Sequence, residues 1–174
     1  MVEADIHARF VKHADFTGSP TRADVWDEYE LGRDLLRKYV RIHSVWMGGS
    51  FLTAKNDAQD MDALFIVSAR DYGKLDLRGK QVVNGFNPQP GLLGTPVRGH
   101  GLNRLDSFLL MWAPWSPLDP NGDPSHAGYA LGRGYWDDFW QRDRYHKPKG
   151  VPPHWKDALP ARGYLEVELD AFNR

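Results

Sequence analysis

Two short motifs in this sequence carry residue types that could do chemistry. Gly49 and Ser50 form a turn after a short apolar segment, and ten positions later Asp60 and Asp62 open the apolar segment 63–67. Residues two apart in a strand share one face and lie about 7 Å apart. Carboxylates placed in this way suit Mg²⁺, which takes oxygen ligands from one or two carboxylates and from substrate phosphates. The Gly-Ser turn offers backbone N–H groups and a hydroxyl to such a phosphate.

Each motif also has a plain structural interpretation. Asp60 and Asp62 could cap a loop at the start of a strand, because Asp side chains bond to nearby backbone groups. Gly49-Ser50 could be an ordinary turn at the end of a strand. The two motifs occur together, and Asp-x-Asp occurs once in the chain. We therefore expect metal ligation by the carboxylates and phosphate contact by the turn.

Other catalytic patterns are missing from the sequence. There is no phosphate-binding Gly-x-x-x-x-Gly-Lys-Ser/Thr loop, no dinucleotide-binding glycine triplet and no complete nucleophile elbow. The seven histidines include no His-x-x-x-His pair, so a zinc hydrolase is not expected. With no cysteine, the chain has no disulfide, thiol nucleophile or cysteine-ligated zinc.

Composition predicts one folded domain over residues 1–174, with residues 1–18 as an irregular N-terminal extension. Of the residues, 41% are hydrophobic and 26% charged, which excludes general disorder. The formal net charge of −1 disfavours a nucleic-acid-binding module or a binder of anionic membranes. The apolar run 108–113 is too short to cross a membrane, and no apolar stretch follows the acidic start. We expect a soluble, cytoplasmic protein.

Periodicity indicates an α+β fold, with a mixed β-sheet flanked by helices. A helix is expected over residues 20–40, with Ser19 as its N-cap. A short helix is expected to place the aromatic residues of segment 135–140 on one face, and residues 71–79 are either a short helix or a loop. Loops are expected over 81–101 and 114–124. The expected strands are 44–47, 60–67, 106–112 and 164–169.

Two blocks of this sequence resemble a known fold. Residues 45–53 read VWMGGSFLT, and residues 60–67 read DMDALFIV. Together they resemble the nucleotidyltransferase fold of the DNA polymerase beta superfamily, and within it a poorly characterised family of small stand-alone members from bacteria and their phages. Asp106 and the aromatic and basic segment 135–150 match further places, so the resemblance spans about residues 20–170. The sequence departs from the usual pattern at Gln59, Met61 and Ala63.

The resemblance implies a minimal nucleotidyltransferase fold with a two-metal site. Asp60, Asp62 and Asp106 would hold two divalent ions, Mg²⁺ or Mn²⁺, and Gly49 and Ser50 would contact the triphosphate of a nucleoside triphosphate. The reaction would transfer a nucleoside monophosphate to an acceptor hydroxyl, with pyrophosphate leaving. The acceptor would be a protein, an RNA end or a small molecule. Such transfer asks the protein mainly for positioning and charge neutralisation.

Asp106 has an independent argument as the third ligand. Asp62 and Asp106 each open a strongly apolar segment, and adjacent buried strands would set these residues side by side at about 5 Å. Three other acidic residues could take this place instead, namely Asp119, Asp123 and Glu166.

A basic run near the C-terminus could also contact phosphates. It comprises Arg142, Arg144, Lys147 and Lys149, and the nucleotide-binding assignment rests on Arg142, Arg144 and Lys149. A solvated helix end is the other interpretation, because cations also favour helix C-termini. Three aromatic residues just before the run are expected in the core or an interface rather than stacked on bases: Trp136, Phe139 and Trp140.

A different class of function is a non-catalytic binding protein on the same fold, comparable to an antitoxin that docks on a protein partner. Such a protein would need no metal-dependent nucleotide turnover, and it should display an exposed aromatic patch.

Overall fold

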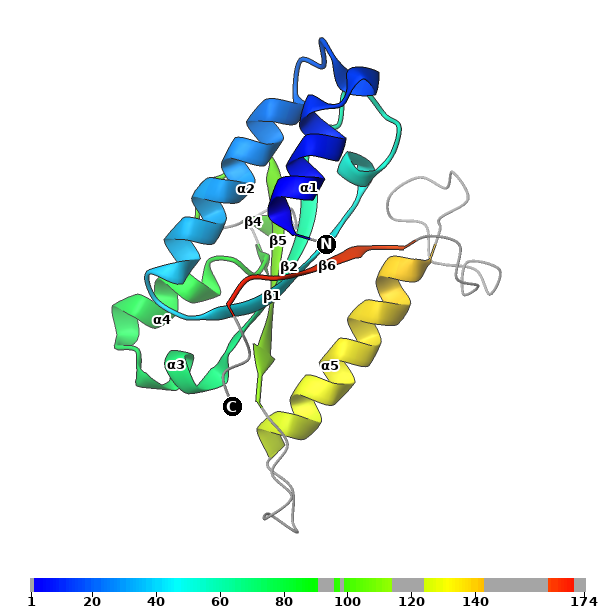
Figure 1. The fold of residues 1–174 in the computed structure, drawn as a ribbon. Helices are drawn as coiled ribbons and strands as arrows, with labels where there is room; N and C mark the ends of the chain where they lie inside the picture. Colours follow the sequence, from blue (N-terminus) through cyan, green and yellow to red (C-terminus); the bar gives the residue numbers. More distant parts are fainter. Residues whose placement is uncertain (1, 91–95, 98, 114–123, 143–162, 171–174) are drawn as a thin grey trace.

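A four-stranded sheet forms the centre of the protein. The computed structural model describes residues 2–90, 96–97, 99–113, 124–142 and 163–170 (Figure 1). The strand order is β5-β2-β1-β6; β1 is antiparallel to β2 and to β6, and β2 is parallel to β5. The α+β class with a mixed sheet flanked by helices is therefore confirmed. The strands are β1 (Ile42–Gly48), β2 (Met61–Ser68), β5 (Leu105–Trp112) and β6 (Leu165–Glu168).

The strand β2 lies inside the sheet and is buried on both faces. Its odd-numbered residues, such as Phe65, belong to a core shared with the N-terminal helices. Its even-numbered residues, such as Leu64 and Ile66, belong to a second core on the opposite face. A strand covered on both faces needs a nearly continuous apolar run, and segment 63–67 supplies it.

Helices cover both faces of the sheet. Figure 1 shows α1, α2, α3 and α4 on one side of it and α5 on the other. The first core holds Tyr29 and Leu36 of α2. In the second core, Trp136 and Trp140 of α5 pack against a buried cluster that includes Trp46 of β1. The helices are α1 (Glu3–His7), α2 (Arg22–Arg37), α3 (Ala69–Lys74), α4 (Leu77–Asn84) and α5 (Pro124–Gln141).

Short polar contacts fix several helix starts. The predicted helix over 20–40 is present as α2, which begins at Arg22 and has Thr21, not the expected Ser19, as its N-cap. Ser19 still contributes, because its Oγ accepts from the Arg22 backbone N–H at 3.2 Å. Ser68 and Asp76 accept a backbone N–H at the starts of α3 and α4 in the same way. The region 71–79, which the sequence left open between helix and loop, therefore belongs to two short capped helices.

The N-terminal residues are helical, which corrects the expected irregular extension. Besides α1, they form the π-helix η1 (Ala8–Lys12) and the 3-10 helix η2 (Ala14–Phe16). Because the three turns differ in pitch, no single helical period runs through the segment. Ile6 is fully buried in the core, and the Glu3 carboxylate accepts hydrogen bonds from Tyr29 Oη and Arg33 Nη1, both at 2.6 Å.

Two other expectations need adjustment. The start of the expected loop 81–101 belongs to α4, and later residues form a small two-stranded sheet of β3 (Gln89–Pro90) and β4 (Pro96–Val97). Helix α5 has 18 residues and is longer than predicted. Residues 114–123 of the other expected loop lie outside the described part. Among the helices that the structure describes, none has the length and apolar character needed to cross a membrane.

Two glycines of α5 test how closely this helix packs on the sheet. A Cβ at Gly132 would lie 2.6 Å from Cδ1 of Leu110, whereas one at Gly134 would meet no described atom within 4 Å. Alanine favours a helix over glycine by about 1 kcal/mol, so Gly134→Ala should raise the free energy of unfolding by about that much. The free energy of unfolding of Gly132→Ala should be at least ~1 kcal/mol lower than that of Gly134→Ala, because the buried Leu110 side chain must move to make room for the new methyl group. Urea unfolding measures both, and equal gains would contradict the close packing.

Candidate functional site

Strand register places two of the predicted carboxylates side by side. Asp62 of β2 pairs with Asp106 of β5, and Gly48 of β1 pairs with Asp62 from the other side. Paired residues of parallel strands point to the same face, and neighbouring strands lie about 4.8 Å apart. Both carboxylates are half-buried, at the starts of their strands. The predicted neighbourhood of these two strands is confirmed, while metal ligation by the pair stays a prediction.

Gly49 brings the Gly-Ser turn against the Asp62 carboxylate. Its backbone has φ +76° and ψ −167°, a conformation that is essentially restricted to glycine. A Cβ at Gly49 would lie 2.2 Å from Asp62 Oδ2. The next residues form the 3-10 helix η3 (Ser50–Leu52), and the Thr53 hydroxyl closes this turn by donating to the Ser50 carbonyl at 2.7 Å. The space that glycine leaves is the space that this carboxylate occupies.

The third predicted ligand, Asp60, lies immediately before β2. It is half-buried, and the adjacent Gln59 carbonyl accepts from Arg104 Nη1 at 3.2 Å. In the described part of the chain, no three His, Cys, Asp or Glu side chains are grouped as a metal site. The structure thus pairs Asp62 with Asp106 by register, and it does not gather Asp60 with them.

The other acidic candidates for the third position have different surroundings. Glu166 lies on β6, two strands away from β2, where it contacts Ser44 Oγ at 3.1 Å and Arg133 Nη2 at 3.2 Å. Asp119 and Asp123 lie outside the described residues. Of the described alternatives, Asp106 is therefore the residue that shares an edge of the sheet with Asp62.

The C-terminal end of α5 reaches the Gly-Ser turn. A Cβ at Gly48 would lie 3.3 Å from Cε3 of Trp140, so this indole covers the end of β1. Arg142 follows two residues later and forms an ion pair with Asp138 one turn before it. The other predicted basic residues, Arg144, Lys147 and Lys149, lie outside the described residues.

The aromatic residues of α5 divide between two faces, which corrects the expectation of a single aromatic face. Trp136 and Trp140 pack against the sheet, in keeping with a core role. Tyr135 and Phe139 point away, with 61% and 43% of their surface exposed. Residues at i and i+4 share a face, whereas the adjacent pairs in segment 135–140 do not.

Arg22 is a buried residue near the site that sequence reasoning missed. Only 1% of its surface is exposed, and its guanidinium lies 3.7 Å from the ring centre of Phe16. Its Nη atoms donate to four carbonyl oxygens: those of Phe10 at 3.0 Å, Phe51 at 2.7 Å, Thr53 at 2.8 Å and Lys55 at 2.5 Å. Desolvation by burial lowers the pKa of Arg22. One signal was available, since a cation at the first position of a helix opposes the helix dipole.

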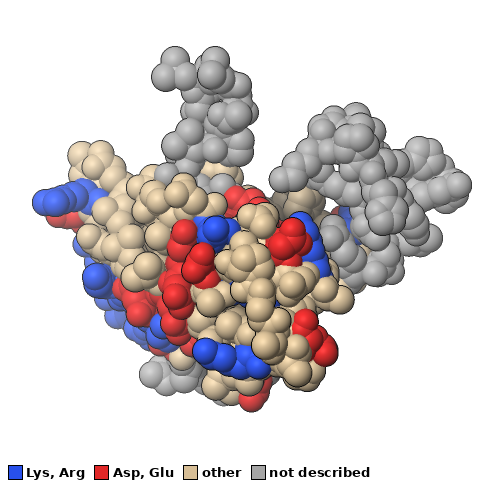
Figure 2. Space-filling view, turned by 90° about the horizontal axis from the view of Figure 1, so that it is seen from above, with Lys and Arg blue, Asp and Glu red and all other residues tan. Residues whose placement is uncertain are grey.

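The surface at this end of the molecule carries both signs of charge. Figure 2 looks down on it and shows Asp and Glu side chains gathered in a band, with Lys and Arg beside them. A surface that follows a nucleic-acid backbone is expected to be a continuous basic stripe. The described part of this end is therefore not of that kind.

A family comparison adds one fact about the chain. Residues 1–152 match the DUF6932 family, which is described as a family of unknown function. The chain belongs to this family. The matched region includes every residue of the predicted site, and Arg22 as well, but not β6. Comparisons with curated proteins and with solved structures found no match.

The contact between Gly49 and Asp62 can be tested through stability. We expect Gly49→Ala to lower the free energy of unfolding by about 1–3 kcal/mol from backbone strain alone, with a further loss from the displaced carboxylate. Asp62→Ala in the same chain removes the clash and leaves the strain. A double-mutant cycle in urea should therefore give a coupling of about 0.5–3 kcal/mol.

Gly101 provides the control for that cycle. Its φ is +73°, and an added Cβ would meet no atom of the described residues within 4 Å. Gly101→Ala combined with Asp62→Ala should be additive. If the Gly49 cycle is additive too, the Asp62 carboxylate does not lie over Gly49.

Proposed function

We propose that this protein is a metal-dependent nucleotidyltransferase, which transfers a nucleoside monophosphate from a nucleoside triphosphate to an acceptor hydroxyl. The observation that carries the proposal is the register pair of Asp62 and Asp106, with Gly49 held against the same carboxylate. The resemblance of segments 45–53 and 60–67 to the nucleotidyltransferase fold supports the same conclusion. We also propose that the protein acts in the cytoplasm.

The donor set fits a hard divalent cation. Asp62 and Asp106 would supply carboxylate oxygens from adjacent strands. Asp60, two residues before Asp62, is the third candidate, although the structure does not gather its side chain with the other two. Mg²⁺ or Mn²⁺ held there would neutralise the charge of the phosphates and stabilise the attacking and leaving oxygens. Backbone N–H groups and the Ser50 hydroxyl would orient the triphosphate. Arg142, at the end of α5, would bring positive charge to it, together with Arg144 and Lys149.

The metal and nucleotide site can be tested by thermal unfolding. A ligand at about a hundred times its Kd stabilises the native state by about 2.7 kcal/mol, which raises Tm by roughly 5–10 °C in a domain of this size. We expect this shift when Mg²⁺ or Mn²⁺ and a nucleoside triphosphate are added together. Asp60→Asn with Asp62→Asn should abolish it and leave the ligand-free protein folded.

Asp57→Asn is the matched control. Asp57 is an exposed carboxylate in the same loop, and its loss changes the charge without touching the proposed site. A full shift in the Asp60→Asn, Asp62→Asn variant would exclude the site, and no shift in the parent protein with any of the common nucleoside triphosphates would exclude the function.

Catalysis is tested separately through Asp106. A group that acts in the transition state affects the rate more than substrate binding. In the proposed two-metal site, Asp106 would contact the ion nearest the acceptor. Asp106→Ala should therefore keep most of the nucleotide-induced Tm shift but reduce transfer by a factor on the order of 100 or more. The measurement is incorporation of label from an α-³²P nucleotide into components of a cell lysate. Equal incorporation by the parent protein and Asp106→Ala would remove Asp106 from the reaction.

A second candidate function, docking on a protein partner without catalysis, is favoured by a different observation. The outward face of α5 exposes Leu131, Tyr135 and Phe139 at positions four residues apart, with exposed fractions of 77%, 61% and 43%. Exposed apolar residues grouped in this way are typical of an interaction surface. The melting experiment distinguishes the two functions, because docking alone requires no response to metal and nucleotide.

A further inference from the structure

The loop from Gly49 to Asp60 carries candidate residues at both of its ends. Gly49 and Ser50 begin it, and Asp60 ends it immediately before β2. The ends are fixed by the strands β1 and β2, but the path between them is not part of the sheet. The loop therefore needs anchors of its own if the turn is to stay in one position relative to Asp62.

Arg22 provides the main polar anchor of this loop. The carbonyls of Phe51, Thr53 and Lys55 are at alternate positions, and all three accept from its guanidinium. A fourth bond, to the Phe10 carbonyl, connects the N-terminal segment to the same group. Ser19, three residues before Arg22, adds a hydrogen bond from its hydroxyl to the Asn56 carbonyl at 2.6 Å. Ser19 and Arg22, just before and at the start of α2, thus bind the carbonyls of residues 51, 53, 55 and 56 of one loop.

The buried Arg22 guanidinium forms no ion pair with a carboxylate of the described residues. The guanidinium contacts carbonyl oxygens and the faces of Phe16 and Phe51, but no carboxylate of the described residues. Desolvating a charge is costly unless fixed dipoles replace water. If this position only had to be filled, an apolar side chain would do so without the cost of desolvating a charge. The hydrogen bonds to the loop carbonyls are what Arg22 provides and an apolar side chain does not.

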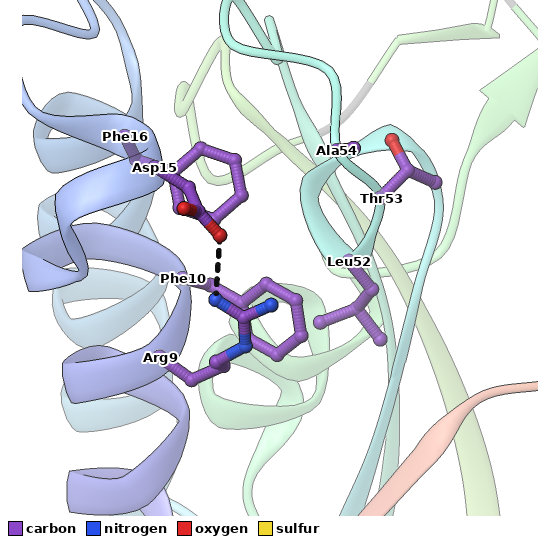
Figure 3. A pocket seen from close by; sticks show the side chains of 7 residues that line it. All are labelled: Arg9, Phe10, Asp15, Phe16, Leu52, Thr53 and Ala54. Carbon is purple, nitrogen blue, oxygen red and sulfur yellow. Dashed lines mark hydrogen bonds and ion pairs between the residues drawn. The ribbon is translucent and has the colours of Figure 1, made fainter.

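Phe51 and Ala58 of this loop are buried in the core, but residues 53–57 between them are exposed and have little packing to replace these bonds. A cavity of about 190 Å³ separates the loop from the N-terminal segment. Figure 3 shows Phe10 and Phe16 on one wall, and Leu52, Thr53 and Ala54 on the other, with the Arg9–Asp15 ion pair at the side. Thr53 and Ala54 are exposed. Exposed residues with few apolar contacts are the ones that open locally, so residues 53–57 depend on the polar anchor.

We infer that Arg22 is a positioning residue for nucleotide binding: its guanidinium fixes the path of residues 51–55 and, through them, holds the Gly49-Ser50 turn in place beside Asp62. The inference rests on the proposed function for the identity of the ligand. The anchoring of the loop does not depend on that identity and can be measured without a ligand.

The test compares two arginines of α2. Arg22→Met removes the anchor, and Arg33→Met is the control, because Arg33 is also largely buried but pairs with Glu3 and Asp34, away from the loop. Hydrogen exchange of the backbone amides of residues 50–58 is measured in both variants. We expect exchange in Arg22→Met to rise by about tenfold or more, the equivalent of one hydrogen bond to a charged group, with β2 and β5 unchanged. Arg33→Met should leave this loop as in the parent.

Nucleotide binding is the second readout. The Kd for Mn²⁺ with ATP, taken from the Tm shift over a concentration series, should weaken about tenfold or more in Arg22→Met and remain near the parent value in Arg33→Met. Arg22→Lys keeps the charge with fewer donors. Relative to Arg22→Met, Arg22→Lys should restore part of the affinity for Mn²⁺ with ATP and part of the protection of residues 50–58 from hydrogen exchange. If Arg22→Met does not fold, Arg22→Lys is compared with the parent protein in both measurements.

The outcomes separate the two proposals. If the parent protein shows no response to metal and nucleotide, the proposed function fails, while the exchange experiment still decides whether Arg22 anchors the loop. If loop exchange is the same in Arg22→Met and Arg33→Met, the anchoring is wrong. If the loop opens in Arg22→Met but the Kd of a responsive protein is unchanged, Arg22 is a structural residue only and the inference is overturned.

Discussion

The pairing of β2 with a neighbour on each side sets the position of the candidate carboxylates. Its register with β5 places Asp62 next to Asp106, and its register with β1 places Gly48 next to Asp62. A shift of one residue would turn every side chain of β2 to the opposite face. Such a shift would move Phe65 from the first core into the second and would turn the Asp62 carboxylate towards the first core, so the packing of the two cores favours the observed register. The geometry of the polar edge is thus a consequence of packing deeper in the sheet.

This register has an electrostatic consequence at the edge of the sheet. Two ionised carboxylates at about 5 Å repel by roughly 1–3 kcal/mol, depending on the effective dielectric constant. Positioned at the strand starts and half-buried, Asp62 and Asp106 keep part of their hydration. Repulsion of this size is normally avoided in a sheet, where like charges directly opposite each other are destabilising.

The sequence predicted the sheet better than the segments around it. The strands expected over 60–67 and 106–112 contain the continuous apolar runs 63–67 and 108–112, and short buried runs of this kind are typical of strands inside a sheet. The same reasoning predicted that Asp62 and Asp106 would be neighbours. It failed for the N-terminal residues, where three short turns of different helix type share no period, and for the first half of α5. The stretch from Ala127 to Gly134 is rich in small residues, so its helix depends on packing against Leu110 rather than on a visible apolar stripe.

Arg22 shows why part of the candidate site could not be predicted. Its partners are backbone carbonyls, which every residue possesses. No side-chain motif in residues 51–55 therefore indicates that Arg22 binds this segment. The ladder of the sheet fixes Asp62 and Asp106, but a single buried cation and a glycine with positive φ fix the turn that faces them. Sheet hydrogen bonds open only with much of the domain, whereas a loop can open alone. If the hydrogen bonds of Arg22 hold the loop closed, their strength sets the fraction of molecules in which the Gly49-Ser50 turn lies beside Asp62. This fraction can change while the stability of the sheet stays the same.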